Sequence, residues 1–219
     1  RALDRAVDGA LQDDEIRCEV ERFLDIARPA GRRNSLTLAA MKFLSPGVPD
    51  IYQGCDLWDL SLVDPDNRRP VDFALRREML RRAVSTNAEE VAASVDDPAD
   101  AGLAKMFLTR LALRVRAERP ACFGRTSGYL PLPARGADAE RVIAFARTDA
   151  DRRPGVVLAA PRWNAARAGW GATSVELPAP SGAARWLHRA GGGLYPPGPA
   201  LASELFSIFP VAILTAEEA

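Results

Sequence analysis

A single strand-like segment constrains the fold of this chain more than any other feature. The segment GVPDIYQG, from Gly47 to Gly54, is short, contains β-branched residues and is bounded by glycines, which is typical of a buried strand. Helical patterns lie on both sides of it. A lone strand would leave its backbone donors and acceptors unpaired. We therefore expect its neighbouring strands to lie outside these 219 residues.

The residues before this segment predict three helices. Apolar side chains recur at helical spacing, beginning with Leu3, Val7 and Leu11. Asp13 or Asp14 can cap the second helix, which should end at Pro29 and Gly31. The third helix then begins at an N-cap supplied by Asn34 or Ser35 and runs to Pro46.

Two further helices follow a long polar loop. Asp72 can cap the helix FALRREMLRRAV, and the dipeptide Asp97-Pro98 favours a helix start because proline suits the first helical position. The last of these helices should stop at Arg119-Pro120. Helix, strand, loop and helix in this order are what remains of a (β/α)₈ barrel that is cut before its last strand.

The second half has a different pattern. Glycine and proline cluster at short intervals, and between them lie the apolar runs RVIAFAR, GVVLAA, TSVEL, ARWLH and FPVAIL. This pattern is typical of an antiparallel sandwich with tight connections, whereas GGGLYPPGP predicts a loop. The expected fold class is α+β, with residues 1–119 as the helical end of a barrel and residues 120–219 as an all-β sandwich.

Charge and cysteine usage exclude several classes of function. Positive and negative charges balance at 29 each, so no basic face exists for nucleic acid or anionic lipid, and no apolar run is long enough to span a bilayer. The scattered residues Cys18, Cys55, Cys122 and His188 do not form a metal site, and no cofactor motif occurs. Unpaired thiols suit the cytoplasm, and the excess of arginine over lysine suggests a bacterial genome of high GC content.

The loop after the strand-like segment has a composition that suits sugar recognition. Aromatic faces can stack on a pyranose, and carboxylate, amide and guanidinium groups can each engage two adjacent hydroxyls. The candidates are Tyr52, Gln53, Asp56, Trp58, Asp59, Asp64, Asn67, Arg68 and Arg69. The alternative is that Asp-Pro-Asp-Asn is ordinary turn chemistry, that an arginine ties the turn to a carboxylate, and that Trp58 is buried under the loop. Nothing in the spacing indicates a catalytic carboxylate pair.

The stretch SPGVPDIYQGCDLWDLSLVDPDNRRPVDF, Ser45 to Phe73, closely resembles a signature of maltooligosyltrehalose synthases, members of the α-amylase clan. The pieces RLALRVRAERPACF, YLPLPARG, RVIAFAR, VVLAAPR, GWGATSVELP and LFSIFPVAIL resemble the C-terminal region of that family in the same order. The resemblance departs at Cys55-Asp56, where the family usually has Thr-Glu, and at Ala172, where Asp is common.

The resemblance implies an intramolecular transferase. Such enzymes convert the reducing-end α-1,4 linkage of a maltooligosaccharide to an α,α-1,1 linkage, by a retaining mechanism whose three carboxylates lie on earlier barrel strands. None of those carboxylates maps onto this chain, so we expect the chain alone to be inactive. The loop residues that map onto the motif would line the reducing-end side of the cleft. They are Tyr52, Gln53, Asp56, Trp58, Asp64, Asn67, Arg68 and Arg69.

Two other interpretations stay open. The second half could be a glucan-binding module with Trp163, Trp170 and Trp186 as platforms, although core packing is the favoured explanation of such tryptophans. It could also be a structural cap on an amylase-like barrel. His188 is interpreted as a surface or strand-end residue. Finally, we expect self-association through a barrel face left exposed, made by the strand Val48 to Tyr52 and by apolar positions on the preceding helices, namely Val20, Phe23, Leu38 and Met41.

Overall fold

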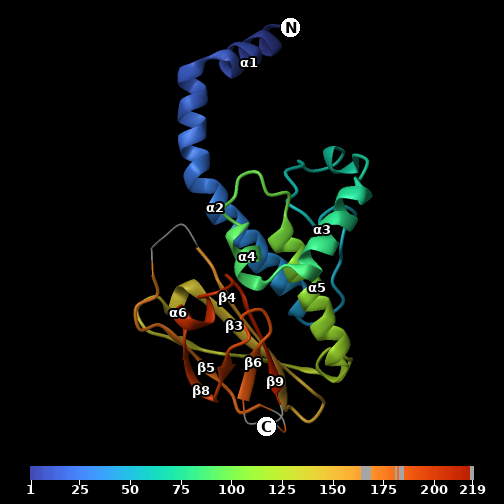
Figure 1. Cartoon of the computed structure of the whole chain (residues 1–219), viewed down its shortest axis with the longest axis vertical. Coiled ribbons are helices and arrows are strands. Elements are labelled where there is room, and N and C mark those ends of the chain that lie inside the picture. Colours follow the sequence, from blue (N-terminus) through green and yellow to red (C-terminus); the bar gives the residue numbers. More distant parts are fainter. Residues whose placement is uncertain (164–168, 181, 183–184, 218–219) are drawn as a thin grey trace.

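A computed structural model describes residues 1–163, 169–180, 182 and 185–217. The first half is helical and the second half is built mainly of strands (Figure 1). The α-helices are α1 (Ala2–Gln12), α2 (Asp14–Leu44), α3 (Phe73–Ser85), α4 (Ala88–Ala93), α5 (Leu103–Glu118) and α6 (Ala202–Leu205). Short 3₁₀ turns occupy η1 (Asp66–Arg68), η2 (Pro120–Cys122) and η3 (Ala139–Arg141). In the part of the chain that is described, no helix has both the length and the apolar character needed to cross a membrane.

Helices α1 and α2 confirm the helical prediction but correct its breaks. Asp13 caps α2, since its side chain accepts hydrogen bonds from the amides of Glu15 and Ile16. The expected end at Pro29 and Gly31 is wrong, because α2 continues through both residues to Leu44. A proline costs a helix the hydrogen bond to the carbonyl four residues earlier. That carbonyl belongs to the exposed residue Asp25, where water can replace the lost partner.

The N-terminal half of α2 and all of α1 project from the rest of the chain (Figure 1). Helix α1 buries none of its residues. Val20, Phe23 and Leu38 on α2 are exposed, as the sequence predicts. Met41 is an exception, because it is partly buried and packs against the helical core.

The predicted strand at Gly47 to Gly54 is wrong for this chain. The segment has no regular secondary structure and ends in a turn at residues 53–56. Val48 is 93% exposed, and Ile51 and Tyr52 are also exposed. A strand exists only through backbone hydrogen bonds to a neighbouring strand. Among the described residues no strand pairs with this segment, so it stays extended and irregular.

The helices after the loop confirm two predicted boundaries and correct a third. Asp72 caps α3 by accepting a hydrogen bond from the amide of Leu75. Helix α5 begins at Leu103, not at Asp97-Pro98, because Asp97 forms a local turn with the amide of Ala99 and the capping carboxylate comes later in the chain. The predicted end before Pro120 is confirmed, and helix α4 was not predicted.

The strands form two antiparallel sheets. The strands are β1 (Gly128–Pro131), β2 (Ala134–Arg135), β3 (Val142–Thr148), β4 (Pro154–Pro161), β5 (Ser174–Leu177), β6 (Arg185–His188), β7 (Leu194–Tyr195), β8 (Gly198–Leu201) and β9 (Ala212–Glu217). The larger sheet has the order β1-β3-β4-β9-β6-β7, and the smaller has the order β2-β5-β8. All five predicted strand runs are confirmed.

The prediction of a loop at GGGLYPPGP is wrong in part. This stretch contains β7 and the start of β8, which pair with β6 and β5 respectively. Pro199 is tolerated because β8 lies at the edge of the smaller sheet, where a missing amide donor breaks no ladder on the open side.

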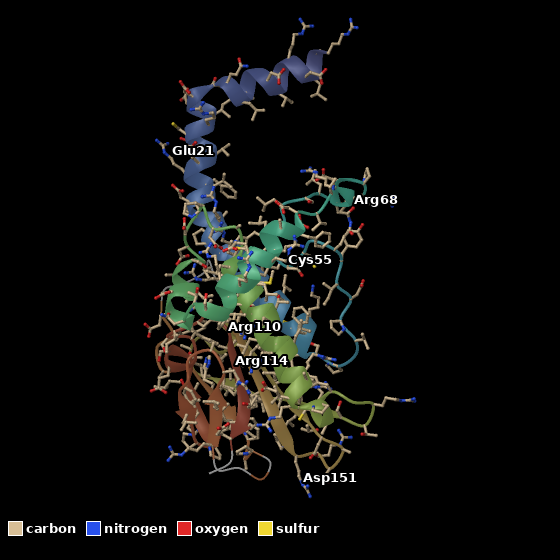
Figure 2. All side chains as sticks on the ribbon, turned by 45° about the vertical axis from the view of Figure 1, so that its right-hand side comes forward. Glu21, Cys55, Arg68, Arg110, Arg114 and Asp151 are labelled. Carbon is tan, nitrogen blue, oxygen red and sulfur yellow. The ribbon has the colours of Figure 1, made fainter. Side chains whose placement is uncertain are left out.

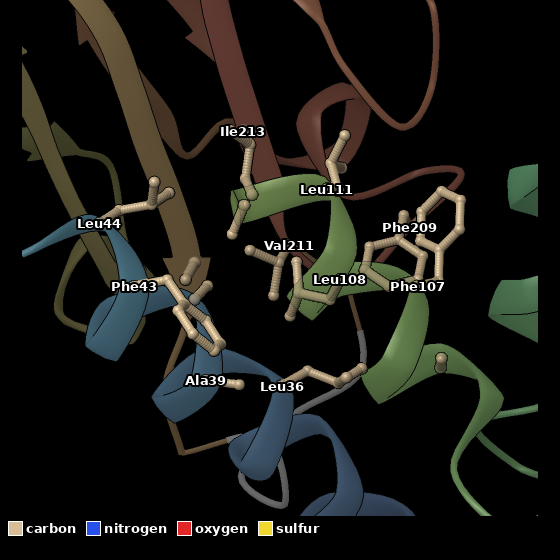
Figure 3. Close-up of a cluster of buried hydrophobic side chains, with 14 of the residues drawn as sticks. Leu36, Ala39, Phe43, Leu44, Phe107, Leu108, Leu111, Phe209, Val211 and Ile213 are labelled. Carbon is tan, nitrogen blue, oxygen red and sulfur yellow. The ribbon is translucent and has the colours of Figure 1, made fainter. Parts of the chain in front are cut away.

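The central strands of the larger sheet, β3, β4 and β9, are buried on both faces. One face, carrying Phe145, Leu158 and Ile213 in register across β3, β4 and β9, packs against α2 and α5 (Figure 3). The opposite face packs against the smaller sheet and carries the fully buried Trp186 of β6. Alternation along each strand produces this division. The buried hydroxyl of Thr37 on α2 also donates to the carbonyl of Pro161, with 2.7 Å between the oxygens.

Candidate functional site

The candidate loop leaves the helical body after Gly54 and returns at the start of α3. Arg76 on α3 holds its first turn, because the guanidinium donates a hydrogen bond to the carbonyl of Gly54. The same group forms an ion pair with Asp56, with 3.4 Å between Nε and Oδ2. Asp56 is therefore part of the loop base, half-buried beside α3.

The next two residues are held by α5 and the segment before it. Lys105 donates from Nζ to the carbonyl of Leu57, at 2.9 Å. Trp58 donates from Nε1 to Oδ2 of Asp100 at 3.1 Å, and its backbone amide donates to the carbonyl of Ala101 at 3.3 Å. Trp58 is half-buried and packs against the helical core, so one side of its indole is used inside the fold.

Beyond Trp58 the loop stands away from the body. Leu60, Leu62 and Val63 are 94%, 76% and 86% exposed. Figure 2 shows Arg68 at the outer end of this excursion and Cys55 at its base. Exposing three large apolar side chains to water is unfavourable in free energy. This part of the loop is therefore expected to contact another surface.

The tip is organised by two short-range ion pairs. Arg68 pairs with Asp64, and Arg69 pairs with Asp66. Asp66 also accepts a hydrogen bond from the amide of Leu62 at 2.7 Å. These contacts match the turn-stapling alternative for both arginines. They also leave the arginine forks on the surface, where exposed guanidinium groups can bind hydroxyls as well as carboxylates.

One polar atom at the tip has no protein partner. The side-chain oxygen Oδ1 of Asn67 is buried, yet among the described residues it accepts no hydrogen bond. Buried acceptors without a partner are rare and costly. Asn67 is thus the tip residue with the clearest unused hydrogen-bonding capacity.

The eight predicted site residues fall into three places. Asp56 and Trp58 lie at the anchored base, while Asp64, Asn67, Arg68 and Arg69 lie at the tip. Tyr52 and Gln53 are exposed on the irregular segment before the first turn. The eight side chains are thus spread over the preceding segment, the base and the tip of the loop.

Local hydrogen bonds keep two loop carboxyl groups in their charged form, which suits them to accept hydrogen bonds and not to transfer protons. Hydrogen bonds from Ser61 lower the pKa of Asp59, and the hydrogen bond from Arg69 lowers the pKa of Asp66. Both carboxyls therefore stay ionised near neutral pH, as sugar-binding acceptors require and as a general acid does not. Burial lowers the pKa of Lys105 on α5, with the nearby Lys42 adding to the effect.

Sequence reasoning missed four residues that shape the loop base. They are Arg32, Arg76, Asp100 and Lys105. Their hydrogen bonds join residues that are 22 to 48 positions apart in the sequence, and Arg32 stacks on a ring. No local spacing of residues predicts such contacts. One feature of the sequence sets Lys105 apart, because it is one of only two lysines in an arginine-rich chain.

No family model matches this chain. A putative maltooligosyl trehalose synthase of Mycobacterium tuberculosis is 33% identical over 219 residues, which is 99% of this chain and 24% of that protein. The solved maltooligosyltrehalose synthase of Arthrobacter ramosus has the same fold over 97% of this chain, with 37% identity and a TM-score of 0.80. Over nearly its whole length, this chain is similar to maltooligosyltrehalose synthases. It spans about a quarter of the length of these relatives.

A more distant structure bears on the fold alone. A hypothetical maltooligosyl trehalose synthase of Sulfolobus tokodaii is 20% identical and covers 96% of this chain, with a TM-score of 0.65. The arrangement of helices and antiparallel sheets thus recurs in this synthase family at low sequence identity.

The tryptophans of the second half do not form a binding platform. Trp186 is fully buried and donates from Nε1 to the carbonyl of Pro178 at 2.8 Å. Trp170 is partly buried and packs against Phe206. Trp163 alone of the three is exposed, at 53%. Two exposed coplanar rings would favour a glucan-binding module, and the structure has none among these three residues.

The expectation that His188 lies at the surface is wrong. It ends strand β6 as predicted, but only 3% of its surface is exposed. Nδ1 accepts hydrogen bonds from the amides of Ala190 and Gly191, so Nε2 carries the proton and donates to the carbonyl of Leu205 at 3.1 Å. Burial lowers the pKa of His188, which keeps the ring neutral. The residue is a structural link between β6 and α6.

Proposed function

We propose that this chain is the C-terminal part of a maltooligosyltrehalose synthase. The whole enzyme converts the reducing-end α-1,4 linkage of a maltooligosaccharide to an α,α-1,1 linkage. The observation that carries the proposal is likeness over nearly the entire chain, in sequence and in fold, to named synthases. Residues 1–119 contribute the helical end of the catalytic barrel and residues 120–219 a β-sandwich domain.

The extended segment at residues 47–54 supports the barrel assignment. Among the described residues no strand pairs with it, and its large apolar side chains are exposed. A barrel strand has both properties when its two neighbours are absent, because parallel strands are buried on both faces and bonded on both edges. In the whole synthase this segment pairs as the last barrel strand, and the loop after it lies at the catalytic end.

The loop from Tyr52 to Arg69 contributes to the reducing-end side of the cleft. The exposed arginine forks, the ionised carboxylates and the side-chain amide of Asn67 are hydrogen-bonding groups of the kind that bind glucose hydroxyls. In transfer without hydrolysis the cleaved glucose must be held and water kept out. The exposed apolar residues of the loop can serve the second need by covering the cleft.

The proposed activity is tested with the longer protein that contains this chain. Incubation with maltopentaose should produce a non-reducing product that carries a terminal trehalose unit, seen as loss of reducing ends without a matching release of glucose. The 219-residue chain alone should produce none, because the three reacting carboxylates of the family do not map onto it. Conversion by the isolated chain, or only hydrolysis by the longer protein, contradicts the proposal.

The surfaces exposed in this chain belong against the rest of the synthase. A groove of about 600 Å³ is lined by residues of α3 and α5, among them the apolar Phe73, Leu80 and Leu113. Arg110 and Arg114, which Figure 2 labels on α5, also line it. Apolar surface of this kind usually marks an interface. The isolated chain therefore self-associates.

Three free cysteines suit the cytoplasm as the location of the protein.

A further inference from the structure

Trp58 stands where the candidate loop leaves the body, and it is held on two sides. Its indole nitrogen donates to Oδ2 of Asp100 at 3.1 Å. The guanidinium carbon of Arg32, on α2, lies 5.3 Å from the centre of the indole ring, within the range of a cation–π contact. An edge contact and a face contact together fix both the position and the tilt of the ring.

Arg32 also fixes the segment that carries Asp100. Its guanidinium donates to four backbone carbonyls, at Val95, Asp97, Pro98 and Asp100. A planar group with five donors can bind several carbonyls and stack on a ring at the same time, and a lysine ammonium cannot. One side chain of α2 therefore binds the segment before α5 and the indole together.

The carboxylate of Asp100 contacts both the start of α5 and the indole of Trp58. It accepts from the amides of Gly102, at 2.8 Å, and of Leu103, at 3.0 Å, and so satisfies free donors at the start of α5. Its Oδ2 atom also accepts from Trp58. Helix α5 and the loop base are thereby joined through a single group.

Beyond this point the described residues give the loop no comparable attachment until α3 begins. Leu60, Leu62 and Val63 are exposed, and the ion pairs at the tip join loop residues only to one another. The direction in which the tip points is then set at Trp58. A small rotation there is magnified at Asn67 and Arg68.

We propose that Arg32 and Asp100 are positioning residues that act through Trp58 to aim the loop at residues 59–70. We call Arg32, Trp58 and Asp100 the loop latch. The inference rests on the proposed function, because the aimed loop is the one that holds the cleaved glucose in the synthase. When the latch is intact, the tip stays over the glucose and water stays out. When it is loosened, the loop opens more often and water competes with transfer.

The latch is tested first on the 219-residue chain, without any assay of activity. Trp58→Phe removes the indole donor but keeps an aromatic ring and leaves Asp100 free to cap α5. Arg32→Lys keeps the charge but loses the planar fork. Trp163→Phe, at an exposed tryptophan remote from the loop, is the matched control. Amide hydrogen exchange within residues 59–70 should become about tenfold faster in both latch variants and stay unchanged in the control.

The second measurement uses the longer synthase with the same three substitutions. Free glucose relative to trehalose linkages should rise about threefold to tenfold in the latch variants, with no change in the control. Unchanged hydrogen exchange in the loop overturns the latch. Faster exchange with an unchanged product ratio overturns its role in the reaction. If the longer protein forms no trehalose linkage at all, the proposed function fails, and the exchange result still decides whether the latch exists.

Discussion

The guanidinium group of Arg68 pairs with the carboxylate of Asp64 across one turn of the loop, with Nη2 3.0 Å from Oδ2. Both side chains are more than half exposed, at 67% and 57%. An exposed pair of this kind adds little to stability. The pair therefore shapes the tip without anchoring it, and it leaves open a second use of the guanidinium group in binding substrate.

Arg68→Ala should separate these two uses in the longer synthase. Because the ion pair is exposed, the free energy of unfolding should change by no more than about 1 kcal/mol. Loss of a charge-assisted hydrogen bond to held glucose should reduce transfer about tenfold to a hundredfold and raise free glucose relative to trehalose linkages. The control is Arg22→Ala, which removes another exposed ion-paired arginine far from the loop. An unchanged product ratio, with activity and melting temperature falling together, would assign Arg68 to the turn alone.

Asn67→Ala should lower activity without lowering stability. The Oδ1 atom of Asn67 is buried and accepts no hydrogen bond among the described residues, so its removal ends a desolvation cost and breaks no protein contact at that atom. The melting temperature should stay the same or rise by about 1–3 °C, while transfer in the longer synthase falls about tenfold. A clear drop in melting temperature would show that the side chain supports the fold.

Gly102→Ala should destabilise the chain more than Gly47→Ala. Both glycines have positive φ, at +125° and +100°, so each substitution carries the strain of a left-handed backbone, about 1 kcal/mol. At Gly102 a new Cβ would also lie 2.7 Å from the backbone nitrogen of Trp58, whereas Gly47 faces open space. Urea unfolding should give a loss of about 3 kcal/mol at Gly102 and about 1 kcal/mol at Gly47. Equal losses would mean that the loop base can move aside.

The stability of the chain should fall below neutral pH because of its single histidine. Burial lowers the pKa of His188 below the ordinary value of 6.5. As pH falls below about 6.5 the unfolded chain binds a proton there and the folded chain does not, so the free energy of unfolding falls until pH passes the lowered folded value. His188→Gln should flatten the dependence between about pH 7 and pH 5.5, above the range where carboxylates titrate. The same slope in both proteins would show that another group is responsible.

Deletion of residues 1–12 should reduce self-association without cost to folding. Helix α1 buries none of its residues, so the melting temperature should stay within about 2 °C. Sedimentation velocity at high concentration should show oligomers of the complete chain and fewer oligomers after the deletion or after Phe23→Glu. Leu194→Glu, at a leucine of the sheet half that is also exposed, is the control. A complete chain that stays monomeric contradicts the self-association.

The sequence by itself determined the elements whose signals are local. Short apolar runs between glycines and prolines predicted β3, β4, β5, β6 and β9, because such runs bounded by turn residues are typical of strands. Asp13 and Asp72 predicted the starts of α2 and α3, because a capping carboxylate reaches amides only two or three residues away. The loop motif and the family resemblance were likewise contained in a contiguous stretch, Ser45 to Phe73.

Only the tertiary structure decided the features that depend on distant partners. Helix α2 passes through Pro29, and the carbonyl that loses its hydrogen bond belongs to the exposed residue Asp25, which composition does not reveal. Residues 47–54 are irregular because a strand is defined by neighbours, and no described strand of this chain pairs with them. Trp58 is held by Asp100, 42 residues later, and the sequence carries no spacing rule for a contact of that range. Secondary-structure preference depends on adjacent residues, whereas side-chain burial and strand pairing depend on how the whole chain packs.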